Sequence, residues 1–212
     1  MNIDSSIPDP EFLEEITALR EGGSQAVADL YSTYRPQLER MVDFRMDRRL
    51  LGRVDAGDIL QDSYMEIARR IDSFLEDPSV SFFVWARQIT WQTLMMAHRS
   101  HLGAQKRDAR QEVQLHGVGF GEGTSVSLAS RLIGDVTSPS EGAIRDEQTE
   151  RLRQALDSMD SIDREVLALR HFEQLSNREV AEVLNLGKTA ASNRYVRALE
   201  RLKKIMDETF GT

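Results

Sequence analysis

The sequence predicts an all-α protein with two helical domains joined by a flexible linker. Leu, Arg, Glu, Ala and Met dominate most of the chain and only 5 of its 212 residues are Pro, a composition that favours helices. Apolar residues recur at spacings of three and four, as in Leu30, Tyr34, Leu38 and Met41, which is the period of a helix with one buried face. A Gly- and Ser-rich stretch interrupts the middle of the chain and separates the two domains.

Composition also excludes several classes of protein. The chain has no Cys, so neither a disulfide framework nor a thiolate metal site can form. Met1–Pro10 is acidic and polar, and the chain has no run of about 18 apolar residues that could span a bilayer. We therefore expect a cytoplasmic protein that is neither secreted nor bound to a membrane.

The net charge of −8 hides two basic clusters. Lys188–Lys204 contains six Lys or Arg residues and one acid, and Arg99–Arg110 contains four basic residues and one acid. Clustered cations can neutralise phosphates, whereas the acidic remainder suits a basic partner. This distribution predicts DNA at the basic clusters, although Arg99–Arg110 fits a solvated helix end equally well.

The first domain is expected to cover residues 1–111, and its most regular segment is Val54–Ile71. Ile59, Ser63 and Ile67 recur there every four residues and predict a buried face. The opposite face is largely acidic and consists of Asp58, Gln61, Asp62, Met65, Glu66 and Arg69. We interpret it as a protein-binding face; the alternatives are a solvated surface or a metal site built from Asp55, Asp58 and Asp62.

An irregular loop, Leu75–Ser81, follows this helix and precedes another apolar helix. Phe82, Trp85 and Ile89 recur there at helical spacing and are expected in the core. The aromatic residues expected to be exposed, because they lie off that stripe, are Phe83 and Trp91.

The linker is expected to cover residues 112–137. Residues 116–123 are rich in Gly, and Thr124–Ser130 is rich in Ser without a helical period, so the chain is expected to be flexible. Four apolar residues could still let parts of it dock, namely Phe120, Leu128, Leu132 and Ile133.

The second domain is expected to cover residues 138–212. Its start is marked by Ser138, Pro139 and Glu141, which suit the cap, the first turn and the capping box of a helix.

A second capping box, Ser176 with Glu179, starts a helix further along the chain, where Leu175 and Val180 stand at the spacing of a hydrophobic staple. Asn185 tolerates the left-handed backbone that ends a helix and is expected to form a tight turn.

The last helix is expected from about Lys188 to Met206. Its buried face should contain Ala191, Tyr195, Leu199 and Leu202, and its outer face carries hydrogen-bonding and cationic side chains. A short turn between a supporting helix and such a helix matches a helix-turn-helix, whose second helix lies in the major groove of DNA. The alternative is an ordinary helical hairpin with a solvated basic face.

Residues 24–111 and 138–207 together resemble a sigma factor of the sigma-70 superfamily, of the extracytoplasmic-function type. In the second domain the likeness lies in Arg164–Leu167, the Leu-Ser-x-x-Glu-Val-Ala motif that starts at Leu175, and the Arg-Ala-Leu-x-x-Leu finish at Arg197–Leu202. The chain departs from the family pattern at Asn185, usually Gly, and at Ala191, usually Val or Ile.

In the first domain the likeness lies in the Asp-Leu-x-Gln-Asp/Glu motif, here Asp58–Asp62, and in the Phe-x-x-Trp pattern at Phe82 and Trp85. Ala86, Thr90 and Gln92 depart from the family pattern.

The resemblance implies a role for each group of residues. Those expected to bind the upstream, minus-thirty-five promoter element are Lys188, Thr189, Ser192, Asn193, Arg194, Val196, Arg197 and Arg201. Those expected to recognise and melt the downstream, minus-ten element are Glu76, Asp77, Ser79, Ser81, Phe83, Trp91, Lys106 and Arg107. Those expected to bind the clamp coiled coil of the largest subunit of the RNA polymerase core are Asp58, Gln61, Asp62 and Glu66.

The expected function is thus promoter-specific initiation of transcription, with bacterial RNA polymerase core and promoter DNA as partners and an anti-sigma protein as a candidate third partner. We expect no enzymatic activity and no cofactor, because the chain has no P-loop and its four His residues form no convincing ligand set. Two alternatives stay open. A DNA-binding regulator that never binds polymerase would not need the acidic face, and a metal-dependent nuclease would use its carboxylates.

Overall fold

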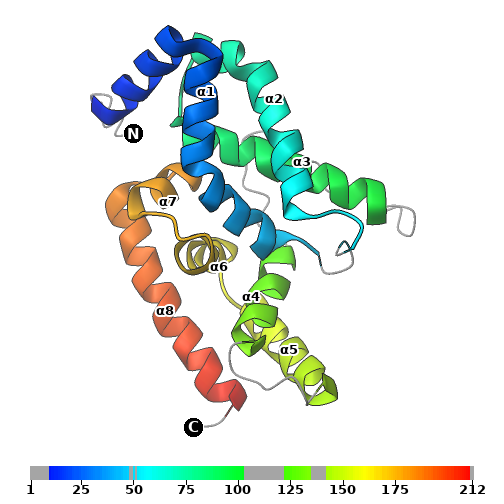
Figure 1. The fold of residues 1–212 in the computed structure, drawn as a ribbon. Helices are drawn as coiled ribbons and strands as arrows, with labels where there is room; N and C mark the ends of the chain where they lie inside the picture. The colour runs from blue at the N-terminus through cyan, green and yellow to red at the C-terminus, as the bar shows by residue number, and fades with distance from the viewer. Residues whose placement is uncertain (1–9, 48–49, 51, 103–121, 135–141, 211–212) are drawn as a thin grey trace. The chain divides into compact units, whose positions relative to one another are not determined.

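The computed structural model describes residues 10–47, 50, 52–102, 122–134 and 142–210, and these residues form helices and turns without a strand (Figure 1). The prediction of an all-α protein is therefore confirmed. The chain divides into two compact units, Met1–Arg107 and Asp108–Thr212. Within the described ranges, no helix has the length and apolar character needed to cross a membrane.

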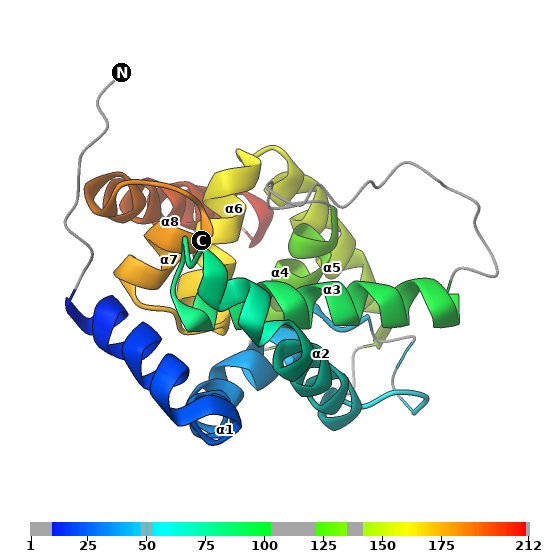
Figure 2. The ribbon, with the colours of Figure 1, turned by 90° about the horizontal axis from the view of Figure 1, so that it is seen from above.

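The first unit contains three helices that all contact one another: α1 (Pro10–Arg45), α2 (Ala56–Glu76) and α3 (Phe82–Leu102) (Figure 2). Its core includes the predicted stripes on each helix, with Leu38, Met41, Ile59, Ile67, Phe82 and Ile89 all buried. Tyr31 joins two of the helices, because its hydroxyl donates a 2.6 Å hydrogen bond to the carbonyl of Leu60 on α2. Burial raises the pKa of Tyr31 to about 12.

α1 is bent at Gly23, which separates a first arm, Pro10–Gly22, from the longer second arm. Gly23 has a φ of +54° and a ψ of −136°, a conformation that residues with a Cβ rarely adopt. The bend, visible in Figure 1, lets the first arm turn back over the ends of α2 and α3.

The second unit contains α4 (Glu122–Gly134), α5 (Gly142–Asp157), α6 (Ser161–Leu167), α7 (Asn177–Val183) and α8 (Lys188–Phe210), with a π-helical turn at Ala168–Phe172. α8 is the longest of these and packs against α5, α6 and α7. Its buried side chains, Ala191, Ala198 and Ile205, recur every seven residues along one face.

α4 lies inside the range expected to be a flexible linker, so that prediction is wrong for residues 122–134. Leu128, Ala129 and Ile133 are buried, because α4 packs against α5 and also contacts α6. The hydroxyl of Thr124 donates a 3.0 Å hydrogen bond to the buried carboxylate of Glu165 on α6. Phe120, the rest of the expected linker and the start signal at Ser138–Glu141 lie outside the described residues.

Candidate nucleic-acid and protein interfaces

α7 and α8 form the predicted helix-turn-helix, and the capping box that starts α7 is present. The amide of Glu179 donates to the Ser176 hydroxyl at 3.2 Å, and the amide of Ser176 donates to the Glu179 carboxylate at 2.6 Å. Asn185 has a φ of +51°, which confirms the left-handed turn. The side-chain amide of Asn177 donates to the carbonyl of Lys188 at 2.9 Å, so the start of α7 is tied directly to the start of α8.

One face of α8 is exposed and polar, as a DNA-binding helix requires. Of the residues predicted to bind the upstream element, all but the half-buried Arg194 are exposed, namely Lys188, Thr189, Ser192, Asn193, Val196, Arg197 and Arg201. On the opposite face Ala191 is buried as predicted, whereas Tyr195, Leu199 and Leu202 are only half-buried. Ala198 and Ile205 occupy the centre of the contact instead, because α8 meets α5, α6 and α7 along a narrow stripe.

The structure places two of the predicted DNA-binding arginines against the protein itself. Arg194 forms a 2.8 Å ion pair with Asp163 near the start of α6 and lies 3.9 Å from Asp160. Arg201 donates a 3.0 Å hydrogen bond to the carbonyl of Ser158, in the turn between α5 and α6. Both side chains therefore hold α8 against α6 and the turn that precedes α6, and they lie beside the exposed polar face of α8.

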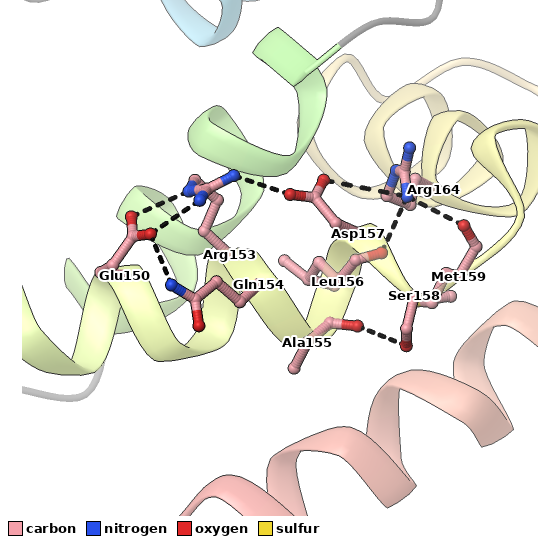
Figure 3. Close-up of polar contacts among 9 residues, drawn as sticks. All are labelled: Glu150, Arg153, Gln154, Ala155, Leu156, Asp157, Ser158, Met159 and Arg164. Carbon is pink, nitrogen blue, oxygen red and sulfur yellow. Dashed lines mark hydrogen bonds and ion pairs between the residues drawn. The ribbon is translucent and has the colours of Figure 1, made fainter.

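A network of arginines fixes that turn, as Figure 3 shows. Arg164 on α6 donates from Nη1 to the carbonyls of Leu156 and Met159, at 2.9 and 2.8 Å. Leu156 lies in the last turn of α5, where carbonyls have no partner within the helix, and Met159 lies in the turn that follows. Arg164 belongs to the sequence motif that resembles the sigma family, and the structure gives it a role in orienting α6 and hence α8.

The same network continues along α5, where Arg153 bridges two acids (Figure 3). Arg153 lies 2.7 Å from both Glu150 and Asp157, and Gln154 donates to Glu150 at 2.8 Å. Hydrogen bonds from Arg153, and then from Gln154, lower the pKa of Glu150 to about 2. This cluster was not predicted from the sequence, although the spacing of three and four residues between these side chains was a signal for it.

A polar contact joins the π-helical turn to α8. The Tyr195 hydroxyl and His171 Nε2 are 3.0 Å apart, and the guanidinium of Arg170 lies 5.3 Å from the centre of the Tyr195 ring. Partial burial of the imidazole, and then the charge of Arg170, lower the pKa of His171. Tyr195 is thus a bridge between helices as well as part of the packing face of α8.

On α2, the predicted protein-binding face is exposed but its carboxylates are not equivalent. Asp58 completes a capping box with Asp55: the Asp58 amide donates to Asp55 Oδ1 at 2.8 Å, and the Asp55 amide donates to Asp58 Oδ2 at 3.1 Å. Gln61 and Asp62 are exposed, and the side chain of Met65 between them and Glu66 is 64% exposed. The face is therefore a polar surface with one apolar side chain near its middle.

Glu66, at the far end of this face, is held by two neighbours on the same helix. It lies 2.6 Å from Arg69 and 2.7 Å from Arg70, and its hydrogen bond with Arg69 is the largest of the effects that lower its pKa. Asp58 and Asp62 therefore carry the negative charge of the face, while that of Glu66 is shared with two cations.

The metal-site alternative finds no support in this geometry. Within the described ranges, no three His, Asp or Glu residues are grouped so that they could hold a metal ion. Asp55 and Asp58 instead satisfy backbone amides at the start of α2.

α2 extends to Glu76, so the loop before α3 is shorter than the predicted Leu75–Ser81. Three of the predicted DNA-binding side chains are exposed here: Glu76 at the end of α2, and Asp77 and Ser79 in the loop. Ser81 is partly buried and starts α3: its hydroxyl accepts from the Val84 amide at 3.4 Å, and its carbonyl accepts from the Trp85 amide at 3.1 Å. Ser81 thus has a structural role in addition to the predicted one.

The prediction that Phe83 is exposed is wrong. Its side chain is 2% exposed and packs 5.1 Å from the ring of Tyr34 on α1. Phe83 lies one residue after Phe82 and therefore off the stripe of Phe82, Trp85 and Ile89. It is nevertheless buried, because α3 packs against α1 as well as against α2. A base cannot stack on Phe83 in this structure.

Trp91 is partly exposed, and the guanidinium of Arg45 lies 5.3 Å from the centre of its ring. A cation over one ring face leaves a composite surface of an aromatic ring and a positive charge, which suits a nucleic-acid strand. Lys106 and Arg107, also predicted to contact DNA, lie outside the described residues.

Comparison with known proteins connects these surfaces to one family. Residues 149–202, which include most of α5, all of α6 and α7, and the first two thirds of α8, match the family model for region 4 of sigma-70. The ECF RNA polymerase sigma factor SigW of Bacillus subtilis is 24% identical over 192 residues, which are 90% of this chain and 94% of SigW. The RNA polymerase sigma-H factor of Pseudomonas aeruginosa is 26% identical over 153 residues, 72% of this chain and 73% of that protein.

Among solved structures, CnrH in complex with the cytosolic domain of CnrY aligns with 93% of this chain and 97% of its own, at 19% identity and a TM-score of 0.49. The region 4 match falls on the observed helix-turn-helix, and the sequence similarity to SigW extends through both units. The chain is therefore similar along most of its length to RNA polymerase sigma factors of the extracytoplasmic-function type, and its residues 149–202 match region 4 of sigma-70.

Proposed function

We propose that this chain binds the core of bacterial RNA polymerase and directs it to specific promoters, where α8 recognises the upstream element. The observation that carries the proposal is the exposed face of α8, which presents Ser192, Asn193, Val196 and Arg197 from the second helix of a helix-turn-helix. Ser, Asn and Arg side chains can form hydrogen bonds with base edges in the major groove, and Val can contact a thymine methyl group.

The first unit supplies the contact with polymerase through the exposed face of α2. Asp58, Gln61 and Asp62 form its polar part, and Met65 offers an apolar anchor among them. An acidic surface of this kind steers and orients association with a basic partner. In the sigma family this segment docks on the clamp coiled coil of the largest subunit, and we assign the same partner here.

The loop between α2 and α3 recognises the downstream element and takes part in melting it. Asp77 and Ser79 are exposed there, as is Glu76 at the end of α2, and Trp91 with Arg45 provides an aromatic and cationic surface on the same unit. Unstacked bases need such polar and aromatic contacts, and each stacking contact contributes about 1–3 kcal/mol. Catalysis in this account belongs to the polymerase, and the protein acts in the cytoplasm, on the nucleoid when bound to polymerase.

Transcription reconstituted from purified components tests this function. Core polymerase would be mixed with a pool of DNA templates randomised over the promoter region, with and without this protein, and the transcribed templates sequenced. We expect protein-dependent enrichment of two short elements at a fixed spacing. Enrichment of one upstream element by DNA binding, without any protein-dependent transcription, would instead favour a DNA-binding regulator that does not use polymerase.

A further inference from the structure

We propose that the first arm of α1, Pro10–Gly22, positions the loop that recognises downstream DNA, and that Glu15 and Arg20 are the positioning residues. This inference rests on the proposed function, in which the loop between α2 and α3 contacts the promoter. Neither residue belongs to the surfaces described above, and both precede the sequence motifs of the first domain.

Two charged side chains of the arm hold the two ends of the loop. At the far end, the backbone amide of Phe82, the first residue of α3, donates a 2.6 Å hydrogen bond to Glu15 Oε1. At the near end, Arg20 Nη2 donates a 2.9 Å hydrogen bond to the carbonyl of Leu75, in the last turn of α2. Hydrogen bonds with an ionised partner are among the stronger ones in proteins, so both junctions are fixed from outside the loop.

Glu15 provides a hydrogen-bond acceptor for an amide in the first turn of α3. The first amides of a helix have no partner within it, and a carboxylate there also interacts favourably with the helix dipole. Ser81 accepts from the amide of Val84, and Glu15 accepts from the amide of Phe82. The start of α3 is therefore capped jointly by its own neighbour and by a residue 67 positions earlier in the chain.

The arm is itself anchored, so it can act as a support. Ile16 and Leu19 are 4% and 1% exposed, and Gly23 supplies the bend that directs the arm over the loop. The second oxygen of Glu15 lies 3.5 Å from the Tyr34 hydroxyl on the longer arm of α1. Tyr34 in turn packs against Phe82 and Phe83, at 6.4 and 5.1 Å between ring centres.

Fixing both ends leaves the exposed middle of the loop with fewer conformations. Asp77 and Ser79 of the loop, and Glu76 at the end of α2, are exposed, and each flank of this segment is hydrogen-bonded to the arm. Preorganisation of this kind strengthens binding, because less conformational entropy is lost when DNA is contacted. The arm should therefore affect selectivity at the downstream element, while polymerase binding through α2 and upstream recognition through α8 stay unchanged.

The test compares Glu15→Ala and Arg20→Ala with Glu14→Ala and Glu21→Ala, which remove exposed acids of the same arm away from the loop. The first readout is hydrogen exchange of the free full-length protein. Loss of one charge-assisted hydrogen bond should make the Phe82 amide exchange about tenfold faster in Glu15→Ala than in Glu14→Ala. Glu15→Gln keeps an acceptor oxygen and should restore part of the protection.

The second readout is transcription from the randomised template pool with core polymerase. We expect Glu15→Ala and Arg20→Ala to weaken the preference at the downstream element about tenfold, with the upstream preference and co-elution with polymerase unchanged. Arg20 is exposed, so its removal leaves the fold intact even where Glu15→Ala proves unstable.

The two readouts separate failure of this inference from failure of the proposed function. A wild-type protein that starts no promoter-specific transcription would contradict the proposed function, and the exchange experiment would still test the contact. A wild-type protein that does so, with Glu15→Ala and Arg20→Ala keeping the downstream preference of the two controls, would overturn the positioning role.

Discussion

Arg197 and Arg201 lie four residues apart on α8, yet their side chains have different surroundings. Arg197 belongs to the exposed face with Ser192, Asn193 and Val196, whereas Arg201 donates to the carbonyl of Ser158. Among the described residues, Arg197 donates only to the carbonyl of Asn193 on its own helix, at 3.4 Å, whereas Arg201, although exposed, also ties α8 to the turn between α5 and α6.

We expect Arg197→Ala to weaken binding to the preferred upstream sequence by about 1–3 kcal/mol, because an arginine that contacts a base contributes about that much to discrimination. Arg201→Ala is the matched control, since it removes the same side chain one turn away and should leave sequence preference unchanged. The measurement is a competition between preferred and randomised duplexes at constant salt. Equal loss of preference in both variants would remove Arg197 from the base-contacting set.

His171 is expected to make the stability of the second unit depend on pH. Its pKa is lowered in the folded protein, so between the folded and unfolded pKa values the unfolded chain binds more protons. The stability that the neutral imidazole contributes is present above the pKa of the unfolded chain, and it is lost as the pH falls towards the pKa of the folded protein.

We therefore expect His171→Gln to reduce the loss of stability that occurs as the pH falls below about 6.5, the ordinary pKa of a histidine. Urea unfolding followed by far-ultraviolet circular dichroism measures this, and His101→Gln, which removes an exposed histidine of α3, serves as the control. A pH dependence that His171→Gln leaves unaltered would contradict the prediction.

Among the helices, α7 illustrates how a short element is specified by its ends. It has only seven residues, too few for a stable isolated helix, and its capping box and the buried side chains of Val180 and Ala181 hold it in place. α7 also helps to orient α8, because the side chain of Asn177 donates a hydrogen bond to the carbonyl of Lys188, the first residue of α8.

Ser176→Ala should lower the free energy of unfolding by about 1 kcal/mol, the usual cost of losing an N-cap side chain. Ser192→Ala, an exposed serine of α8 without a capping role, should not destabilise the protein. Circular dichroism suits this measurement better than tryptophan fluorescence, because Trp85 and Trp91 both lie in the first unit. Equal stability of the two variants would show that the capping box contributes little.

Local signals in the sequence were sufficient for the caps and the helix-turn-helix but insufficient for α4. Ser176 with Glu179, and Asn185 in the turn, act between residues close in the chain, so their chemistry is visible in the sequence. The period of Leu128, Ala129 and Ile133 was obscured by surrounding Ser and Gly residues. α4 becomes helical through contact with α5 and with Glu165, both of which follow it in the chain.

The candidate site was missed or misjudged wherever its geometry depends on distant residues. The period of α3 placed Phe82 and Ile89 correctly, but it could not reveal that α1 also covers Phe83. Likewise, the basic sequence of α8 does not distinguish Arg194, paired with Asp163 thirty-one residues away, from Arg197. The support of the loop by Glu15 and Arg20 spans 67 and 55 residues and had no local signal.

At the scale of the whole molecule, the proposed function divides the contacts between the units: the first offers surfaces to polymerase and to downstream DNA, and the second offers α8 to upstream DNA. Tethering in one chain raises the effective concentration of the second contact once the first has formed. Modest affinity of each unit for polymerase or DNA is therefore enough for specific binding of the assembled complex. The acidic face of α2 distinguishes this account from that of a simple DNA-binding regulator.

The most direct test of that account is co-elution of the full-length protein with purified core RNA polymerase in size-exclusion chromatography at low salt. We predict that the wild-type protein co-elutes and that Asp58→Arg/Asp62→Arg does not, because the double change reverses the charge of the exposed face. Glu14→Arg/Glu21→Arg, which makes the same charge change on exposed residues of α1, should still co-elute. A wild-type protein that elutes separately from polymerase would contradict the account.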